Sequence, residues 1–230
     1  MNPLRLIRDD WPLAVLAAVL LLCGLLLAVA AWARRRERRG DWGPGLVGIR
    51  TDLDGYSPAD MRATVNRTPV DDPQERWLLG LAAPFVEPVG LLHDRWSLVP
   101  AFCSDAWKRH LAVVAERWGV TRADAWKRET ARAEQHLADA ADPLAVWTLS
   151  SFAMLLRLGV ALRHTSGTRA RERLRVAAAP LRERHSDWLG FADDWIAAAE
   201  IARPGRTAEL RADVRTLFAE DGPWHDPGWP

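Results

Sequence analysis

Two stretches of the chain are apolar over several helical turns. The first runs from Leu13 to Ala33, 21 residues without a charge, and Trp11 and Trp32 flank it. As a helix it would span about 31 Å, which is long enough to cross the hydrocarbon core of a bilayer. Tryptophan is enriched at both membrane interfaces, so the flanking residues suit the same interpretation. The pattern predicts one transmembrane helix over residues 13–33.

The charges around this segment predict its orientation. Five arginines lie among the six residues 34–39, whereas only Arg5 and Arg8 precede the segment. By the positive-inside rule, residues 1–12 form a short extracytoplasmic N-terminus and everything after Arg34 is cytoplasmic. The sequence therefore predicts a single-pass protein of the cell inner or plasma membrane.

A cleaved signal peptide is the alternative to this anchor. Ala28-Val29-Ala30 resembles a cleavage site, and cleavage would release an exported helical domain. The apolar core is too long for a signal peptide, and an arginine run directly after the site disfavours export. The uncleaved anchor is the preferred interpretation.

The second apolar stretch, from Pro143 to Leu162, is predicted to be the centre of a soluble domain. Asp142 has the position of an N-cap and Pro143 that of the first helical residue. Arg157 is the only charge, and a helix that is apolar on all sides is usually surrounded by other elements. Ser150 lies seven residues before Arg157, so the two share one polar stripe of this buried helix.

The rest of the chain divides into a linker and a helical domain. Residues 34–56 combine the basic flank with a glycine-rich stretch and are predicted to form a flexible linker. In residues 57–230 apolar positions recur at helical spacing, and no window alternates with the period of a strand. The predicted fold class is all-α, a compact multi-helix soluble domain with a loop at residues 85–102 and a kink or break at Pro180. Helix starts are predicted at Ser57, Asp72, Ser104, Thr121, Asp142, Thr168, Ser186 and Thr207.

Composition narrows the classes of function. Beyond residue 40 acidic residues outnumber basic ones by three, which disfavours binding of nucleic acid through its phosphates. The thirteen tryptophans are spread along the chain, as expected of core anchors rather than of a stacking platform. Cys23 and Cys103 are too few and too distant to form a disulfide framework or a zinc site.

No catalytic motif stands out. The chain has no glycine-rich phosphate loop, no nucleophile elbow and no histidine pair of the zinc-protease type. The paired acids Asp71-Asp72 and Asp193-Asp194 are explained by a helix cap and a solvated helix face. The sequence predicts no cofactor and no metal. Surface positions are the preferred interpretation of the histidines, and a metal site assembled with carboxylates from His110, His136 or His164 stays open.

Arg157 is the polar residue with the strongest structural requirement. An unpaired charge in a core is costly, so the guanidinium needs a partner. We expect that partner on the helix from Ser186 to Arg203. A buried ion pair that fixes helix orientation is the first interpretation, and an arginine at the floor of a pocket for a small anion is the second. The candidate partners are Asp187, Asp193, Asp194 and Glu200.

Four short segments between about Trp77 and the C-terminus form a recognisable set. They are Trp118 and Gly119 in a turn, Trp147 and Gly159 with Arg157 in the central helix, Trp188 and Phe191 at the next helix entry, and Pro223, Trp224 and Trp229 near the end. Together they resemble the bacterial family known as domain of unknown function 1266. Thr148 and Ser151 depart from it, because the central helix of the family often has an aspartate and an arginine there. The resemblance implies a compact helical domain and brings no activity, substrate or cofactor.

These observations predict a membrane-tethered cytoplasmic interaction or scaffold module with an unidentified protein partner and no enzymatic activity. A small-ligand sensor or enzyme with a pocket around Arg157 is the alternative, and the exported domain is the third. The tail from Asp221 to Pro230 either folds back, with Trp224 and Trp229 filling grooves, or is a partner-binding peptide. Fold-back is preferred, because exposed tryptophans lower solubility.

Overall fold

The computed structural model describes residues 70–100, 104–138, 142–220, 222–225 and 229. Within these residues the chain forms helices and no strand, which confirms the all-α fold class. None of the helices there is both long enough and apolar enough to cross a bilayer. The predictions for residues 1–12, 13–33 and 34–56, and for a helix beginning at Ser57, lie outside the described residues. The helices are α4 (Pro73–Gly80), α5 (Ala83–Val86), α6 (Asp105–Arg117), α7 (Ala123–Leu137), α8 (Ala145–Ala161), α9 (Gly167–Arg184), α10 (Trp188–Ala202) and α11 (Thr207–Leu217).

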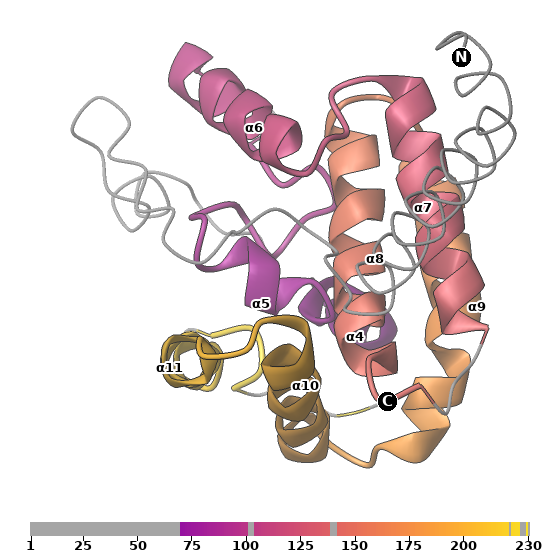
Figure 1. The fold of residues 1–230 in the computed structure, drawn as a ribbon. Helices are drawn as coiled ribbons and strands as arrows, with labels where there is room; N and C mark the ends of the chain where they lie inside the picture. Colours follow the sequence, from indigo (N-terminus) through magenta and orange to yellow (C-terminus); the bar gives the residue numbers. More distant parts are fainter. Residues whose placement is uncertain (1–69, 101–103, 139–141, 221, 226–228, 230) are drawn as a thin grey trace, which may run out of the picture. The chain divides into compact units, whose positions relative to one another are not determined.

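Helix α8 is the centre of this arrangement, as its apolar sequence predicts. Every residue from Ala145 to Gly159 is buried. Figure 1 shows α8 between neighbouring helices, and α7, α9, α10 and α5 all pack against it. Pro143 was predicted to be the first helical residue, but the helix begins two residues later, at Ala145. Asp142 instead caps the turn before the helix, where it accepts a hydrogen bond from the Leu144 amide at 2.8 Å.

The helix starts show where side-chain capping follows the sequence pattern and where it does not. Asp72 caps α4 by accepting from the Gln74 amide at 2.9 Å, as predicted. The expected cap at Ser186 is wrong by one residue, since the carboxylate of Asp187 accepts from the Gly190 amide at 2.8 Å. The helix start expected at Thr121 is wrong by one residue as well.

At that position Arg122 is the N-cap of α7, and its side chain makes no cap hydrogen bond. The carboxylate of Asp124 instead binds two arginine side chains, Arg122 at 3.1 Å and Arg128 at 3.2 Å. A carboxylate in the first turn therefore favours side-chain ion pairs here over the reciprocal capping bond.

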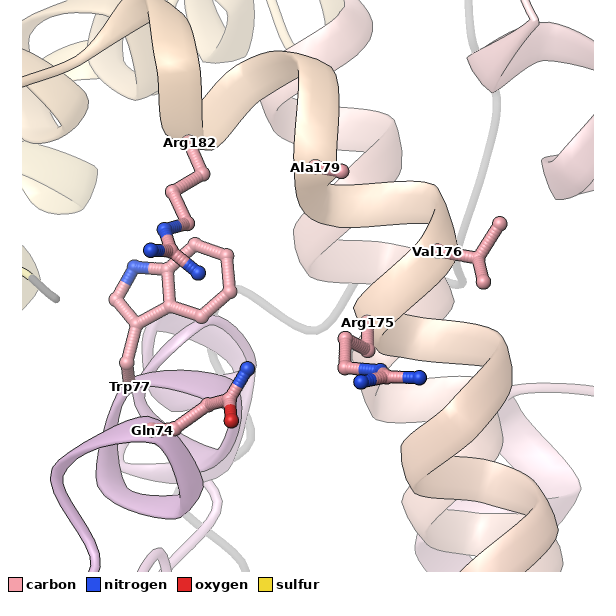
Figure 2. A pocket seen from close by; sticks show the side chains of 6 residues that line it. All are labelled: Gln74, Trp77, Arg175, Val176, Ala179 and Arg182. Carbon is pink, nitrogen blue, oxygen red and sulfur yellow. The ribbon is translucent and has the colours of Figure 1, made fainter.

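Pro180 bends α9 and does not divide it. The helix runs from Gly167 to Arg184 with the proline inside it. Figure 2 shows the helix axis changing direction between Ala179 and Arg182. This is the expected result of removing one amide donor from the helix while the flanking turns remain packed.

Residues 87–100, which follow α5, form a loop. The loop predicted from residue 85 begins two residues later, because α5 extends to Val86, and no helix follows α5 before residue 100. The Leu92 amide donates to the Leu98 carbonyl at 2.9 Å, and Leu98 has a left-handed backbone with φ of 62°. Both leucines are buried. The loop is thus part of the core and not a surface connection.

The C-terminal tail folds back, which agrees with the preferred interpretation. Trp224 is 2% exposed, its ring stacks on Trp188 at 4.9 Å between centroids, and its N–H donates to the Gly80 carbonyl at 3.0 Å. Trp229 is partly buried and meets the rings of Trp77 and Trp188 edge-on at 5.6 and 5.0 Å. The described tryptophans are therefore core anchors.

One glycine of α8 is required by a tryptophan that lies against the helix backbone. The Trp126 N–H donates to the Leu155 carbonyl at 2.7 Å. A Cβ atom at Gly159 would lie 2.5 Å from two atoms of the Trp126 ring, closer than van der Waals contact allows. The absence of a side chain at Gly159 lets α7 approach α8.

We predict that Gly159→Ala lowers the free energy of unfolding by roughly 1–3 kcal/mol, because the added methyl forces Trp126 away from α8. Urea denaturation of the purified protein measures this change. The matched control is Gly190→Ala in α10, where the nearest atom to a new Cβ is 3.5 Å away. That control is expected to gain up to about 1 kcal/mol from helix propensity. Equal changes in the two variants would contradict the packing argument.

Candidate functional site

Arg157 binds backbone carbonyls and not the predicted carboxylate. Its side chain is 0% exposed. The guanidinium donates to the carbonyls of Leu79, Leu92 and Arg95 at 3.3, 2.5 and 2.7 Å. The expected partner on α10 is therefore wrong. The carbonyls of Leu79 and Arg95 each also accept a backbone amide at 3.3 Å, from Ala82 and Leu98. A carbonyl oxygen has two lone pairs, so each can still accept from a side chain that carries several N–H groups.

Burial has a measurable electrostatic consequence for Arg157. It lowers the pKa of the guanidinium to about 9, and the nearby charge of Asp94 opposes this shift. The group therefore remains protonated at neutral pH. Ser150 is also fully buried, and neither its hydroxyl nor the Arg157 Nε–H finds a partner among the described residues. The polar stripe exists, but Ser150 and Arg157 form no hydrogen bond with each other in the described structure.

The loop that Arg157 holds is fastened at two further points. Nε2 of His110 lies 2.5 Å from the Val89 carbonyl and donates to it. Trp96 donates to the Glu75 carboxylate at 2.7 Å. His110 is fully buried, so the expectation of a surface histidine is wrong there. Its burial lowers the pKa of the imidazole below the ordinary value of 6.5, against the opposing effect of the Val89 hydrogen bond.

Asp187 and Asp194, two of the four acidic candidates, have structural roles. Asp187 caps the helix. Asp194 accepts hydrogen bonds from Arg184 at 2.9 Å and from Nε2 of His185 at 3.0 Å. These contacts join the end of α9 to α10. The structure thus does not bring Asp187 and Asp194 together with Arg157 and Ser150.

The histidines do not assemble a metal site in the described part of the chain. No group of three or more histidine, cysteine or acidic side chains there is arranged to hold a metal ion. His164 lies against the Val120 carbonyl, with Nε2 at 3.2 Å from the oxygen. His110 has already been accounted for by its contact with the loop.

A hollow between α4 and α9 is a candidate ligand pocket of the described structure. Its volume is about 330 Å³, at the lower end of the range for ligand pockets. Figure 2 shows Gln74 and Trp77 on α4, Arg182 of α9 reaching over Trp77, and Val176 on the side of α9 away from α4. We call this hollow the α4–α9 pocket. Its lining residues are Gln74, Trp77, Arg175, Val176, Ala179 and Arg182.

Two arginines border the α4–α9 pocket and no carboxylate lines it. Arg175 pairs with Glu172 one turn earlier at 2.9 Å. The Arg182 guanidinium lies over the Trp77 ring at 6.0 Å from its centroid (Figure 2). Trp77 is only 1% exposed, because Arg182 and Trp229 cover it. Val176, the aliphatic residue at the other side of the lining, is 65% exposed.

The lining residues of the pocket offer contacts for a bound partner. Among its lining residues there is no nucleophile, no carboxylic acid and no imidazole that could move a proton near neutral pH. Its contributions are an apolar wall, two guanidinium groups and one amide. This pocket was not predicted from the sequence. One residue could have indicated it: Val176 is an apolar residue on the otherwise charged, solvent-facing side of α9, where the helical pattern gives no reason for it.

The residues that carry the family resemblance lie in the core and its helix ends. Phe85 meets the rings of Trp118 and Trp147 edge-on at 5.4 and 5.0 Å. Gly119 ends α6 with φ of 65°. Pro223 precedes Trp224 in the folded-back tail. The comparisons with known proteins found no matching family model, no matching curated protein and no matching solved structure. The resemblance to domain of unknown function 1266 stays a prediction.

We predict that Arg157→Lys lowers the free energy of unfolding by roughly 2–4 kcal/mol, because one ammonium group cannot reach three separated carbonyls, so buried hydrogen bonds of the loop are lost. Denaturant unfolding measures the loss. Arg169→Lys on the exposed face of α9 is the control and is expected to change stability by less than about 0.5 kcal/mol. A change that small at Arg157 would contradict the role assigned to its hydrogen bonds.

We also predict that stability falls as the pH drops below about 6.5, and that His110 contributes to this fall. The pKa of His110 is lowered in the folded protein, so below 6.5 the unfolded chain binds a proton that the folded protein does not. Above pH 6.5 both states are neutral and the contribution is constant. His110→Gln keeps a donor for Val89 and does not titrate, so its unfolding free energy should depend less on pH between 5 and 7.

Unfolding measured at a series of pH values tests this prediction. His225→Gln is the control, because His225 is exposed near the C-terminus. It should keep the pH dependence of the unmodified protein. An unchanged pH dependence in His110→Gln would show that His110 is not a source of the acid sensitivity.

Proposed function

We propose that the protein is a membrane-anchored cytoplasmic interaction module that binds a protein partner through the α4–α9 pocket. One observation carries the binding role: an apolar hollow bordered by Trp77, Arg175 and Arg182. Tryptophan and arginine are enriched among the residues that contribute most to protein–protein affinity, and such residues cluster around small pockets. The absence of acid–base groups among the lining residues supports binding without catalysis.

The membrane part of the proposal rests on sequence alone. The apolar segment of residues 13–33 and the arginines that follow it support an anchor with the helical domain on the cytoplasmic side. The resemblance to domain of unknown function 1266 supports a compact helical body and is silent about activity. An exported domain, the competing interpretation, predicts a shorter purified chain, which an intact-mass measurement distinguishes.

A ligand site around Arg157 is not favoured. The guanidinium is fully buried and donates to three carbonyls, and Arg157 does not line the α4–α9 pocket. The pocket that the structure offers lies instead on the outer face of α9. A partner that reaches it needs no rearrangement of the core.

We predict that a photo-crosslinking amino acid at Val176, in the full-length protein in its membrane, captures a specific partner. Ala179→Trp should abolish this adduct, because the indole fills the hollow from the exposed face of α9. The matched controls use Ala131, an exposed alanine of α7. A crosslinker at Ala131 should not capture the same partner, and Ala131→Trp should leave the Val176 adduct unchanged. Equal adducts at both positions, or an adduct that survives Ala179→Trp, would overturn the proposal.

A further inference from the structure

We infer that the partner of the α4–α9 pocket is an acidic linear peptide segment that inserts one large apolar side chain between two arginines. This inference rests on the proposed function and names the chemistry of its partner. It draws on the charge of the pocket, the availability of that charge, and the size of the hollow.

The charge of the pocket selects an acidic partner. Helix α9 contains six arginines and two glutamates between Gly167 and Arg184. Two of these arginines, Arg175 and Arg182, line the pocket, and no acidic residue does. Opposite charges across an interface steer association and select partners. A segment with carboxylates on both sides of its apolar anchor is complementary to this pair.

The arginines of α9 differ in how firmly they are held. Arg171, Arg173 and Arg184 pair with acids of other helices: Glu75 at 2.8 Å, Glu134 at 2.8 Å and Asp194 at 2.9 Å. Those pairs join helices to each other. Arg175 pairs only within its own helix, and both members are more than half exposed, with side-chain exposures of 56% and 59%. An exposed pair of this kind contributes little and is readily exchanged for an external carboxylate.

Arg182 is placed to act together with Arg175. It is exposed, and its guanidinium lies over the Trp77 ring at the opposite end of the pocket from Arg175 (Figure 2). A guanidinium over an aromatic face can also bind a carboxylate, because its N–H groups point outward in the plane of the guanidinium. The two arginines can therefore hold carboxylates on both sides of an inserted side chain.

The size of the hollow favours a single anchor. A volume of about 330 Å³ suits one large aliphatic or aromatic side chain with its surroundings. An amphipathic helix would need a groove that accepts anchors from successive turns. Membrane docking of α9 is less well supported, since Val176 is its one large exposed hydrophobic residue in the described structure and interfacial helices bury a row of bulky residues. These observations favour a linear peptide.

The test measures the binding of three fluorescein-labelled peptides to the full-length protein in micelles of a neutral detergent. Each carries one central leucine, flanked on both sides by two aspartates, two serines or two lysines. Fluorescence anisotropy gives the dissociation constants. The aspartate peptide is expected to bind most tightly, at least fivefold more tightly than the serine peptide, and the lysine peptide most weakly. Raising the salt concentration should reduce this difference.

Variants locate the effect in the pocket. Arg175→Gln and Arg182→Gln should each weaken binding of the aspartate peptide about twofold to fivefold, the range for exposed ion pairs, and leave the serine peptide nearly unchanged. Arg169→Gln is the matched control, because Arg169 is exposed on the same helix and does not line the pocket. It should not alter binding. Ala179→Trp should abolish binding of every peptide.

The outcomes separate this inference from the proposed function. If the three peptides bind equally and Ala179→Trp abolishes binding, the pocket is an interaction site without charge selection and the inference is overturned. The same holds if no peptide binds while the Val176 crosslinker captures a partner. If no peptide binds and the crosslinker captures nothing, both fail.

Two other occupants would also overturn the inference. Phosphatidylserine vesicles are the first. Vesicle binding that both glutamine variants weaken, with no peptide binding, would make the pocket a lipid site. Light scattering that shows a dimer of the full-length protein, dissociated by Ala179→Trp and not by Ala131→Trp, would make the occupant a second copy of the chain.

Discussion

The hydrogen bonds of Arg157 join three pieces of backbone that no regular secondary structure connects. Its guanidinium reaches the end of α4 at Leu79 and the following loop at Leu92 and Arg95, all from the buried face of α8. Burying a guanidinium is costly, and burying carbonyls without donors is costly as well. The terminal N–H groups of Arg157 find acceptors here and the Leu92 carbonyl finds a donor, so the loop can lie in the core although it is not helical.

The position of the pocket follows from this constraint. Helix α4 is eight residues long and too short to be stable alone. It is held at its end by Arg157 and near its start by Glu75, which binds Arg171 of α9 and Trp96 of the loop. The pocket lies where this short helix meets α9, close to the bend at Pro180. An interaction surface on the outside of the domain thus depends on a polar contact at its centre.

The sequence predicted the features that depend on residue type and local spacing. The burial of α8 follows from a run of apolar residues with one charge, and the cap at Asp72 follows from an acid before a proline. The partner of Arg157 could not be predicted in the same way. Every residue has a backbone carbonyl, so no residue type shows which carbonyls can accept a hydrogen bond from a buried side chain. The choice between Ser186 and Asp187 as a cap likewise depends on backbone angles that neighbouring polar residues leave open.

The α4–α9 pocket could not be predicted either, because it depends on how two helices pack. Periodicity assigns Leu174, Ala177 and Leu181 to the buried side of α9 and leaves Val176 among the solvent-facing positions. Only the packing of α4 beside that outer face turns Val176 and Ala179 into the wall of a hollow. Gly159 is a similar case. The reason for a glycine at this position is clear only from the structure, in which Trp126 packs against it and leaves no room for a Cβ atom.

Amide hydrogen exchange of the unmodified protein tests the central claim most directly. If Arg157 holds the loop in the core, the Leu92 amide, which donates to the Leu98 carbonyl at 2.9 Å, should exchange about as slowly as the amides in the middle of α8. Slow exchange at both places would show that loop and central helix open together, in one cooperative unit. Exchange of the Leu92 amide at the rate of a solvent-exposed loop, with α8 still protected, would contradict the account.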